Sequence, residues 1–423
     1  MECLCNKCCD LIVQIMLTGF VRLASGDQHS LVVKQDGSVW STGYNEFGQL
    51  GDGSTFDSVK FVWTFLSDVK AVAVGSDHSI VLKQDGSVWA AGRNMHGQLG
   101  DRSTVDKHAF VEVMPSGAQA VSAGGDYSMV LQKDGSVWVT GWDKRGEYKD
   151  GITASRHFLM VVSNGVKAIS TGGYHSMVLK QDGSVWSAGS NSFGQLGADL
   201  NPDDELTFYQ VVDSGVKAVA AGVYHSLLLT QDGCVWATGH NSFGQLGDGT
   251  TTDKSTFTQV VAGHVQALDA GHSHSIIVMQ DGSVWTTGNN AHGQLGDGST
   301  IDKHSFVKVI SRGGKAVAAG YGNSMILAHD GNVWAAGWNL YGQFGDGSTS
   351  SKHIFHNVAR LRKSTEKKTT IGTFDPGKSR SIVCLVHSCM SSVDSVPHCC
   401  FASCNIQTKH LHPNIPNTTF LLF

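Results

Sequence analysis

The chain has 423 residues, 41% of them hydrophobic and 16% charged, with 51 Gly against 6 Pro and a formal net charge of −5. This composition is that of a soluble globular protein with many tight turns, and no segment reaches the roughly 20 apolar residues that a transmembrane helix needs. The charge is uneven, because residues 361–423 carry +4 and residues 21–360 carry −8. So acidic a central region argues against binding to nucleic acid.

Residues 1–20 form a cysteine-rich N-terminal segment that we expect to be irregular, and its apolar run, Leu11 to Leu17, is short for a secretory signal. Cysteines gather at both ends of the chain, and only Cys234 lies within residues 21–360. The central region therefore does not depend on disulfides, which fits a reducing compartment. We expect a cytoplasmic protein, with the nucleus as the alternative. Neither cysteine group has a zinc-finger spacing, so no metal site is predicted.

A unit of about 49 residues recurs seven times between residues 21 and 360. Each copy contains a Gly-x-x-His-Ser motif or a close variant, then an Asp-Gly turn, a Val-Trp pair and a further Gly. The Trp residues follow one another at intervals of 48 to 50 residues and are Trp40, Trp89, Trp138, Trp186, Trp236, Trp285 and Trp334. A fixed period of this kind indicates one array of repeats, in place of the two or three separate domains that the length alone would suggest.

Each unit predicts four short β-strands, because β-branched runs alternate with Gly and Asp-Gly turns and no helical periodicity appears. In the fifth repeat the expected strands are 216–221, 226–230, 235–238 and 257–261. A four-stranded sheet of this size cannot bury both faces alone, so seven must pack side by side in a closed ring. We therefore predict an all-β protein, with a seven-bladed β-propeller over residues 21–360, the repeated Trp in the core of each blade, and a disordered, basic, cysteine-containing tail over residues 361–423.

The repeat at residues 173–197, GYHSMVLKQDGSVWSAGSNSFGQLG, resembles that of the regulator of chromosome condensation family, whose pattern runs approximately AxGxxHxxxLxxDGxVxxWGxNxxGQLG. The resemblance covers about 80% of the chain and implies a seven-bladed propeller. The founding member of that family is an exchange factor for the small GTPase Ran and uses an inserted hairpin, the β-wedge. Other members serve as protein-binding modules.

Intervals of 48 to 50 residues leave no room for an inserted wedge. We therefore expect a monomeric, non-enzymatic scaffold that binds a protein partner and needs no cofactor. The alternative is a guanine nucleotide exchange factor for a Ran-like small GTPase.

The third repeat departs from the pattern in the loop where the other repeats carry Gly-Gln-Leu-Gly or Gly-Gln-Phe-Gly. It carries instead aromatic and charged residues, which are of the types enriched at protein-binding hot spots. The candidate partner-binding residues in this loop are Trp142, Lys144, Arg145, Glu147 and Tyr148. Simple drift of one repeat is the alternative explanation.

A second candidate is a series of basic residues after the Gly-Asp-Gly-Ser-Thr turns, which includes Lys107, His108, Lys303 and His304. Equivalent positions of different blades lie on one face of a ring, so these residues would form a basic rim suited to an acidic protein surface or a phosphate. Solvated loop charge is the alternative. We interpret the His-Ser pair as satisfying buried backbone, and a Phe about 21 residues after each Trp as blade packing.

Overall fold

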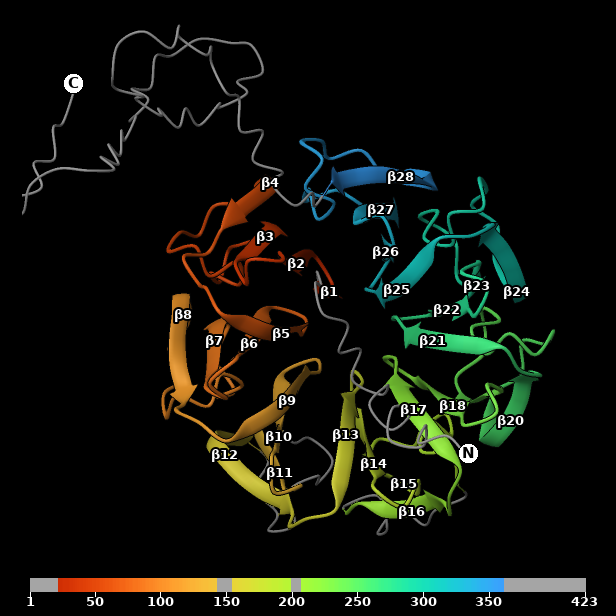
Figure 1. Cartoon of the computed structure of the whole chain (residues 1–423), viewed down its shortest axis with the longest axis horizontal. Helices are drawn as coiled ribbons and strands as arrows, with labels where there is room; N and C mark the ends of the chain where they lie inside the picture. The colour runs from red at the N-terminus through yellow and green to blue at the C-terminus, as the bar shows by residue number, and fades with distance from the viewer. Residues whose placement is uncertain (1–21, 143–153, 199–206, 361–423) are drawn as a thin grey trace, which may run out of the picture. The chain divides into compact units, whose positions relative to one another are not determined.

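The structure, a computed structural model, describes residues 22–142, 154–198 and 207–360. These residues form seven four-stranded antiparallel sheets, the blades, arranged in a ring (Figure 1). The prediction of an all-β, seven-bladed propeller is confirmed. None of the described residues lies in a helix, and so no apolar helix long enough to cross a membrane occurs among them.

Each blade is built from four consecutive strands, which we name A to D from the centre of the ring outward. The first four blades contain, in order, β1 (Arg22–Ser25), β2 (His29–Val33), β3 (Val39–Gly43) and β4 (Ser58–Trp63); β5 (Val69–Val74), β6 (His78–Lys83), β7 (Val88–Gly92) and β8 (Lys107–Met114); β9 (Ala118–Ala123), β10 (Tyr127–Gln132), β11 (Val137–Trp142) and β12 (Ala154–Val162); and β13 (Val166–Thr171), β14 (His175–Lys180), β15 (Val185–Gly189) and β16 (Tyr209–Val212).

The remaining three blades contain β17 (Val216–Ala221), β18 (His225–Thr230), β19 (Val235–Gly239) and β20 (Lys254–Val261); β21 (Val265–Ala270), β22 (His274–Met279), β23 (Val284–Gly288) and β24 (Lys303–Ile310); and β25 (Gly314–Ala319), β26 (Asn323–Ala328), β27 (Asn332–Gly337) and β28 (Lys352–Arg360). In blade 5 the first predicted strand is confirmed residue for residue. The other three occur at the predicted places, and the largest difference is an outer strand that starts three residues earlier.

The hydrophobic core lies between the blades. Strand B is buried along almost its whole length, whereas strand D is largely half-buried or exposed. One cluster joins Leu229 and Val235 of blade 5 to Val265 and Ile277 of blade 6. Each blade therefore covers the face of its neighbour, which explains why strand B is apolar on both sides. Full burial of one such side chain stabilises the fold by about 1.5–3 kcal/mol.

The ring closes between blades 7 and 1 without exchange of a strand among the described residues. Asn323 of blade 7 donates a side-chain hydrogen bond to Ser25 Oγ of blade 1 at 2.9 Å. The hydroxyl of Thr42 in blade 1 lies 2.8 Å from the carbonyl oxygen of Gly342 in blade 7. Thr287 makes the same contact from blade 6 to Gly244 of blade 5 at 2.9 Å. The closing interface thus repeats a contact that joins neighbouring blades elsewhere.

Glycine precedes each His of the repeat by three residues because the blades approach one another closely at this point. A Cβ placed on Gly222 would lie 2.5 Å from the carbonyl oxygen of Gly271 in the next blade and 2.5 Å from Cε1 of His225. Neither neighbour has room to move, since one is backbone and the other is a buried ring. The glycines in this position touch successive blades all round the ring, down to Gly320 against the carbonyl of Gly26.

The His-Ser pair connects neighbouring blades. Nε2 of His225 lies 2.9 Å from Ser275 Oγ of blade 6, whose hydroxyl donates to the carbonyl oxygen of Gln245 at 2.7 Å. Because the serine has only one proton, His225 must donate to Ser275 through Nε2–H. Burial lowers the pKa of His225 to about 3, so the ring is neutral at physiological pH. The sequence predicts that the His-Ser pair satisfies a buried backbone group, and the hydrogen bond from Ser275 to Gln245 confirms this prediction.

The prediction that the repeated Trp residues lie in the core is wrong in its extent, because all seven are only partly buried. One face of the indole packs against an inter-blade cluster, as Trp285 does at the interface of blades 5 and 6. In five blades the indole N–H donates to a serine two residues earlier, Ser283 for Trp285 at 3.0 Å, whereas blades 5 and 7 carry Cys234 and Asn332 there. The outer face can carry an ammonium group, which for Lys34 lies 3.3 Å from the ring centre of Trp40. The polar N–H holds the indole at the blade edge, where it closes the core.

Candidate functional site

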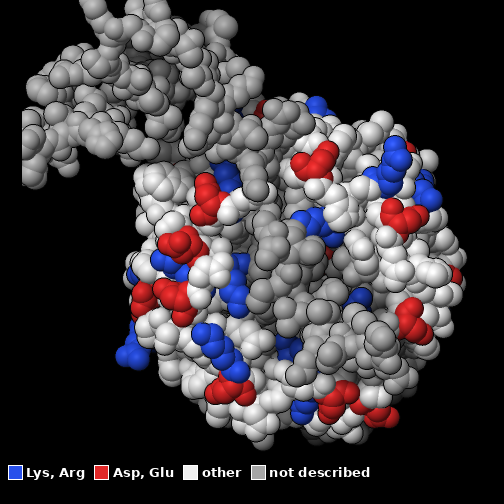
Figure 2. Space-filling view, in the orientation of Figure 1, with Lys and Arg blue, Asp and Glu red and all other residues white. Residues whose placement is uncertain are grey.

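The propeller has two faces built from different connections. The turns between strands A and B and the loops between strands C and D lie on one face, which we call the AB face. The B–C hairpin turns and the links between blades lie on the other, the BC face. In the view of Figure 2, Lys and Arg atoms lie both around the middle of the ring and at its rim, and Asp and Glu atoms lie mostly toward the rim.

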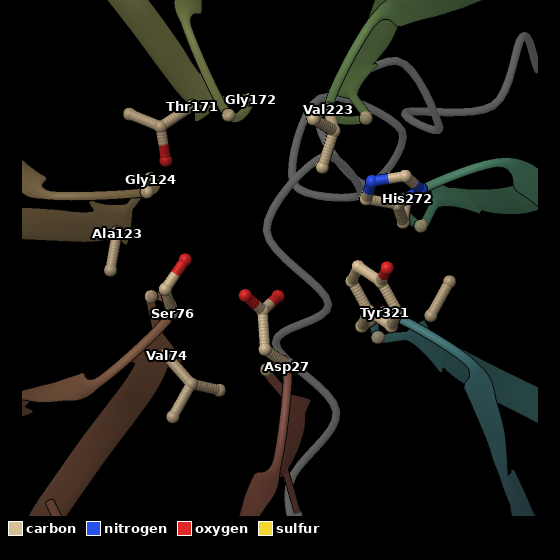
Figure 3. A pocket seen from close by; sticks show the side chains of 18 of the residues that line it. Asp27, Val74, Ser76, Ala123, Gly124, Thr171, Gly172, Val223, His272 and Tyr321 are labelled. Atoms are coloured by element: carbon tan, nitrogen blue, oxygen red, sulfur yellow. The ribbon is translucent and has the colours of Figure 1, made fainter. Parts of the chain in front are cut away.

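The central opening on the AB face is a cavity of about 100 Å³ lined by the A–B turns of all seven blades. Figure 3 shows the side chains of Asp27 and Ser76 on one side of this cavity, with the rings of His272 and Tyr321 on the other. A cavity of this size holds only a few water molecules. Typical small-molecule pockets measure about 300 Å³ or more, so the opening is better described as the centre of a larger surface.

Acidic side chains occupy one part of this surface, contributed by blades 1 to 3; we call Asp27, Glu46, Asp77 and Asp126 the acidic sector. Burial raises the pKa of Asp27 to about 6, opposed by a hydrogen bond from Ser76 and reinforced by Asp77 and Asp126. Burial also raises the pKa of Asp77, which the nearby guanidinium of Arg93 opposes. The acidic sector therefore concentrates carboxylates that repel one another.

Arg93 is the only Lys or Arg in the described A–B turns and in the described parts of the C–D loops up to the Gly-Gln-Leu-Gly motif. Its Nη1 lies 3.2 Å from Asp77 Oδ2, and its guanidinium lies 5.1 Å from the ring centre of Phe47. Because both charged groups are partly exposed, the pair contributes at most about 1 kcal/mol. One cation does not balance four acids, so the sector keeps a negative field.

Aromatic side chains occupy the rest of the surface, from blade 4 through blade 7 to blade 1. Ring centres follow one another at 5.5 Å for Tyr174 and Tyr224, 6.0 Å for Tyr224 and His272, and 4.3 Å for His272 and Tyr321. The series continues through Trp338 and Tyr341 to Tyr44, at 6.1, 5.7 and 5.0 Å. The resulting aromatic arc consists of Tyr174, Tyr224, His272, Tyr321, Trp338, Tyr341 and Tyr44.

The C–D loops that carry part of this arc are held rigid by a buried asparagine. Asn45 accepts the N–H of Leu50 at 2.9 Å and donates through Nδ2 to the carbonyl oxygens of Ser54 and Phe56 at 3.1 Å. Asn339 repeats the arrangement in blade 7. Each asparagine thus fixes both ends of its loop. The aromatic residue just before it, Tyr44 or Trp338, is thereby presented in a defined place before any ligand arrives.

The structure describes Trp142 among the predicted partner-binding residues of the third repeat. Trp142 ends strand β11 on the AB face, and its indole stacks on His96 of blade 2 with ring centres 4.9 Å apart. It therefore lies on the same face as the aromatic arc. Lys144, Arg145, Glu147 and Tyr148 lie outside the described residues.

The predicted basic rim lies at the start of the outer strands, where its lysines contact acidic residues of their own loops. Lys107 pairs with Asp101, and Lys303 with Asp297, each at 3.1 Å. His108 lies against Gly48 of the preceding blade, and His304 lies against Gly244 in the same way. These contacts reduce the positive charge that the rim offers to a ligand. Its part in binding stays a prediction.

Sequence reasoning missed the aromatic arc because its members lie in the variable columns of the repeat. Tyr174 and Tyr224 occupy the position just before the repeated His, where blades 2 and 3 carry Asp77 and Asp126. Tyr44 and Trp338 follow the repeated Gly after strand C. A comparison of these columns across the seven copies would have grouped the aromatic residues. Among the residues that the structure describes, no three His, Cys, Asp or Glu side chains converge as a metal site would require.

Family models match this chain as an RCC1-like domain over residues 112–383 and as regulator of chromosome condensation (RCC1) repeats over residues 20–49, 69–98, 36–82 and 85–131. A search of curated protein sequences finds no match. Among solved structures, Prp20p from Saccharomyces cerevisiae, described with its binding to Gsp1p and histones, is similar with a TM-score of 0.70 at 20% identity, covering 82% of this chain and 88% of that chain.

Two further solved structures agree in fold. Yeast RCC1 (Prp20) bound to Kap60 gives a TM-score of 0.70 at 18% identity over 88% of both chains. Human WBSCR16 gives 0.66 at 23% identity, covering 74% of this chain and 87% of that chain. The RCC1-like domain model alone spans more than half of the chain, and the repeats and blades agree with it, so the protein belongs to the RCC1-like domain family.

Proposed function

We propose that this protein is a non-enzymatic scaffold that binds a protein partner on its AB face. The observation that supports this proposal is the aromatic arc on that face. Tyrosine and tryptophan are the residues most enriched at binding hot spots, because they bury a large area at a low cost in side-chain entropy. Tyr174 and Tyr321 are 43% and 40% exposed, so part of the arc is open to a ligand.

The charge of the AB face indicates the kind of partner surface. The acidic sector adjoins the aromatic arc, since Tyr44 of the arc and Glu46 of the sector belong to the same loop and are hydrogen-bonded to each other. A partner that presents Lys or Arg beside apolar side chains would gain both charge pairing and cation–π contacts. We therefore expect binding to weaken as salt concentration rises.

The test is affinity capture of the tagged full-length chain from its native cells, followed by quantitative comparison of the recovered proteins. We expect the double variant Tyr174→Ala with Tyr321→Ala to recover at least tenfold less of the specific partner than the wild type. The matched control is Phe65→Ala with Met160→Ala, whose side chains are 70% and 54% exposed, the first in a link on the BC face and the second on an outer strand. Equal recovery by all three proteins would show that the AB face is not the binding face.

A second candidate function, nucleotide exchange on a Ran-like small GTPase, is favoured by the similarity to Prp20p, which is described with its binding to Gsp1p. Release of labelled GDP from a Ran-like GTPase, measured with and without the purified full-length chain, distinguishes the two. We expect no acceleration by the chain. A clear acceleration would replace the scaffold proposal with exchange activity.

The loop at residues 142–149 is proposed as part of the same binding face, because Trp142 lies there. Trp142→Ala with Arg145→Ala is expected to weaken partner capture, and unchanged capture would remove this loop from the proposal. Cytoplasmic location and a monomeric state stay predictions. Proximity labelling in native cells and light scattering of the purified chain test them.

A further inference from the structure

Blades 2 to 7 carry a hydrogen-bonding side chain at the second position of their innermost strand. These residues, which we call the lysine ring, are Lys70, Gln119, Lys167, Lys217, Gln266 and Lys315. Four are cationic, two are neutral amides, and none is acidic or apolar. All six are half-buried.

A β-bulge occurs at this residue in all six blades. In blade 2, Val69 pairs with Lys83 and Ala71 pairs with the adjacent residue, Leu82, so Lys70 is the extra residue of the bulge. The same shift occurs around Gln119, Lys167, Lys217, Gln266 and Lys315. A bulge bends the strand locally and redirects the side chain of the extra residue. Six bulges in register therefore place these six side chains at equivalent points around the centre of the ring.

The lysine ring lies at the opposite end of the inner strands from Asp27. Strand A runs from this ring to the A–B turn, a length of about 20 Å for six residues at roughly 3.3 Å each. The ammonium of Lys70 donates to the backbone carbonyl of Gln119 in the next blade at 3.1 Å, so this side chain lies along the wall formed by neighbouring inner strands. Burial lowers the pKa of Lys315, as expected for an ammonium group partly removed from water.

In the links before blades 2 and 5, Asp68 and Asp213 bring carboxylates to the BC face, and each B–C hairpin turn adds an aspartate. The hairpin carboxylates accept hydrogen bonds within their own turns, as Asp85 does from the backbone and side chain of Ser87 at 2.8 and 2.7 Å. They belong to turns that lie further from the centre than strand A.

We propose that the lysine ring binds a compact anion that carries several phosphate groups. Lysine is a point-charge phosphate binder, and no Arg is present in the ring to favour a bidentate carboxylate. The six donors surround one axis, so a ligand that satisfies several of them must carry negative charge on several sides. An extended nucleic acid would bring most of its phosphates against a region of charge −8, whereas a compact ligand meets only the local cations.

Two sources of such an anion are soluble inositol polyphosphates and the headgroups of phosphoinositide lipids. Calorimetry with inositol hexakisphosphate at 0.15 M ionic strength and flotation with vesicles containing phosphatidylinositol bisphosphate distinguish them. Sodium sulfate at equal ionic strength is the control for simple charge. Binding of either phosphate probe, without comparable binding of sulfate, supports the proposal and identifies the source. If neither probe binds the full-length chain, the proposal is wrong.

The variants use residues that the ring already contains. Lys167→Gln with Lys217→Gln copies the native Gln119 and Gln266, so the fold is expected to persist, as thermal unfolding can verify. We expect at least a tenfold weaker affinity for the probe. The matched control is Lys34→Gln with Lys83→Gln, which removes two cations near the B–C turns. An equal loss in both double variants would assign binding to the general charge of the face and overturn the proposal.

A gain of binding gives an independent readout. Gln119→Lys with Gln266→Lys raises the ring from four lysines to six. We expect the affinity for the phosphate probe to rise severalfold and its salt dependence to steepen. A lower or unchanged affinity in a folded variant would contradict a site formed by the ring.

Discussion

Two interfaces, one between blades 5 and 6 and one between blades 3 and 4, make equivalent contacts with different residues. Between blades 5 and 6, His225 reaches Ser275 near the centre, and Gly247 receives the ring of Phe306 near the outside. Between blades 3 and 4, the inner contact is made by Tyr127, whose hydroxyl donates to the carbonyl oxygen of His175 at 2.7 Å and lies 3.0 Å from Ser176 Oγ.

The outer halves of the two interfaces differ more than the inner halves. The third repeat lacks the Gly-Gln-Leu-Gly motif, and Phe208 of blade 4 packs against the core cluster between blades 3 and 4. Strand β16 has four residues, whereas β24 has eight. The inner contact therefore accepts a different side chain if it can still reach the serine of the next blade. The outer contact of blades 5 and 6 uses a glycine of the Gly-Gln-Leu-Gly motif, which the third repeat lacks.

The largest expected effect comes from removing the outer phenylalanine at each interface. Phe306→Ala removes a ring that fills the space above Gly247, and we expect it to lower the free energy of unfolding by about 2–4 kcal/mol. Phe208 follows a repeat without that motif, and we expect Phe208→Ala to cost about 1 kcal/mol. Urea denaturation of both variants measures the difference. Equal costs would mean that the Gly-Gln-Leu-Gly loop does not support the outer strand.

A smaller effect is expected from the inner contact, where the two interfaces can be exchanged. His225→Leu leaves the buried Oγ of Ser275 without its donor and should cost about 2 kcal/mol. His225→Tyr installs the residue that blade 3 uses naturally, and we expect a cost below about 1 kcal/mol. The same denaturation experiment tests both. If the tyrosine variant is as unstable as the leucine variant, the inner contacts are not interchangeable.

The repeats predicted the fold well because its stabilising contacts are themselves repeated. Trp intervals, Asp-Gly turns and Gly-x-x-His-Ser motifs each occur in every blade or nearly so, so the blade number and the strand order follow from one sequence. The predicted burial of the Trp residues is too high, because hydrophobicity alone does not show that the indole N–H donates a hydrogen bond to a serine at the blade edge, as in Trp285. That contact depends on a hairpin geometry that composition does not express.

The candidate site was harder to predict, because its residues come together only when the ring closes. Tyr44 and Tyr341 are almost 300 residues apart in sequence, yet their ring centres lie 5.0 Å apart across the closing interface. The lysine ring was missed for a related reason. A lysine at the second position of a strand looks like an ordinary solvated charge until six bulges place its equivalents around one axis.

The smallest expected effect concerns a contact between inner strands, and it depends on pH. Ser122 of blade 3 accepts the backbone N–H of Thr171 in blade 4 at 3.1 Å, whereas Asp269 accepts the N–H of Ala319 across the interface of blades 6 and 7 at 2.8 Å. Burial raises the pKa of Asp269 to about 6, although its two backbone hydrogen bonds oppose the shift. Asp269→Ser copies the blade 3 residue and retains an acceptor without placing a charge in the interface.

A raised pKa in the folded state means that Asp269 favours folding most below its unfolded pKa of about 4, and that this contribution is lost as the pH rises through about 6. At pH 7.5 we therefore expect Asp269→Ser to be more stable than the wild type by about 1–2 kcal/mol, a part of the roughly 3 kcal/mol that a shift of two pKa units represents. The advantage should disappear near pH 4.5. Glu112→Gln, at an exposed carboxylate, should show no such dependence. Stability curves for Asp269→Ser and wild type that run parallel between pH 4.5 and 7.5 would mean that the carboxylate is compensated within the interface, and that serine and aspartate are equivalent there.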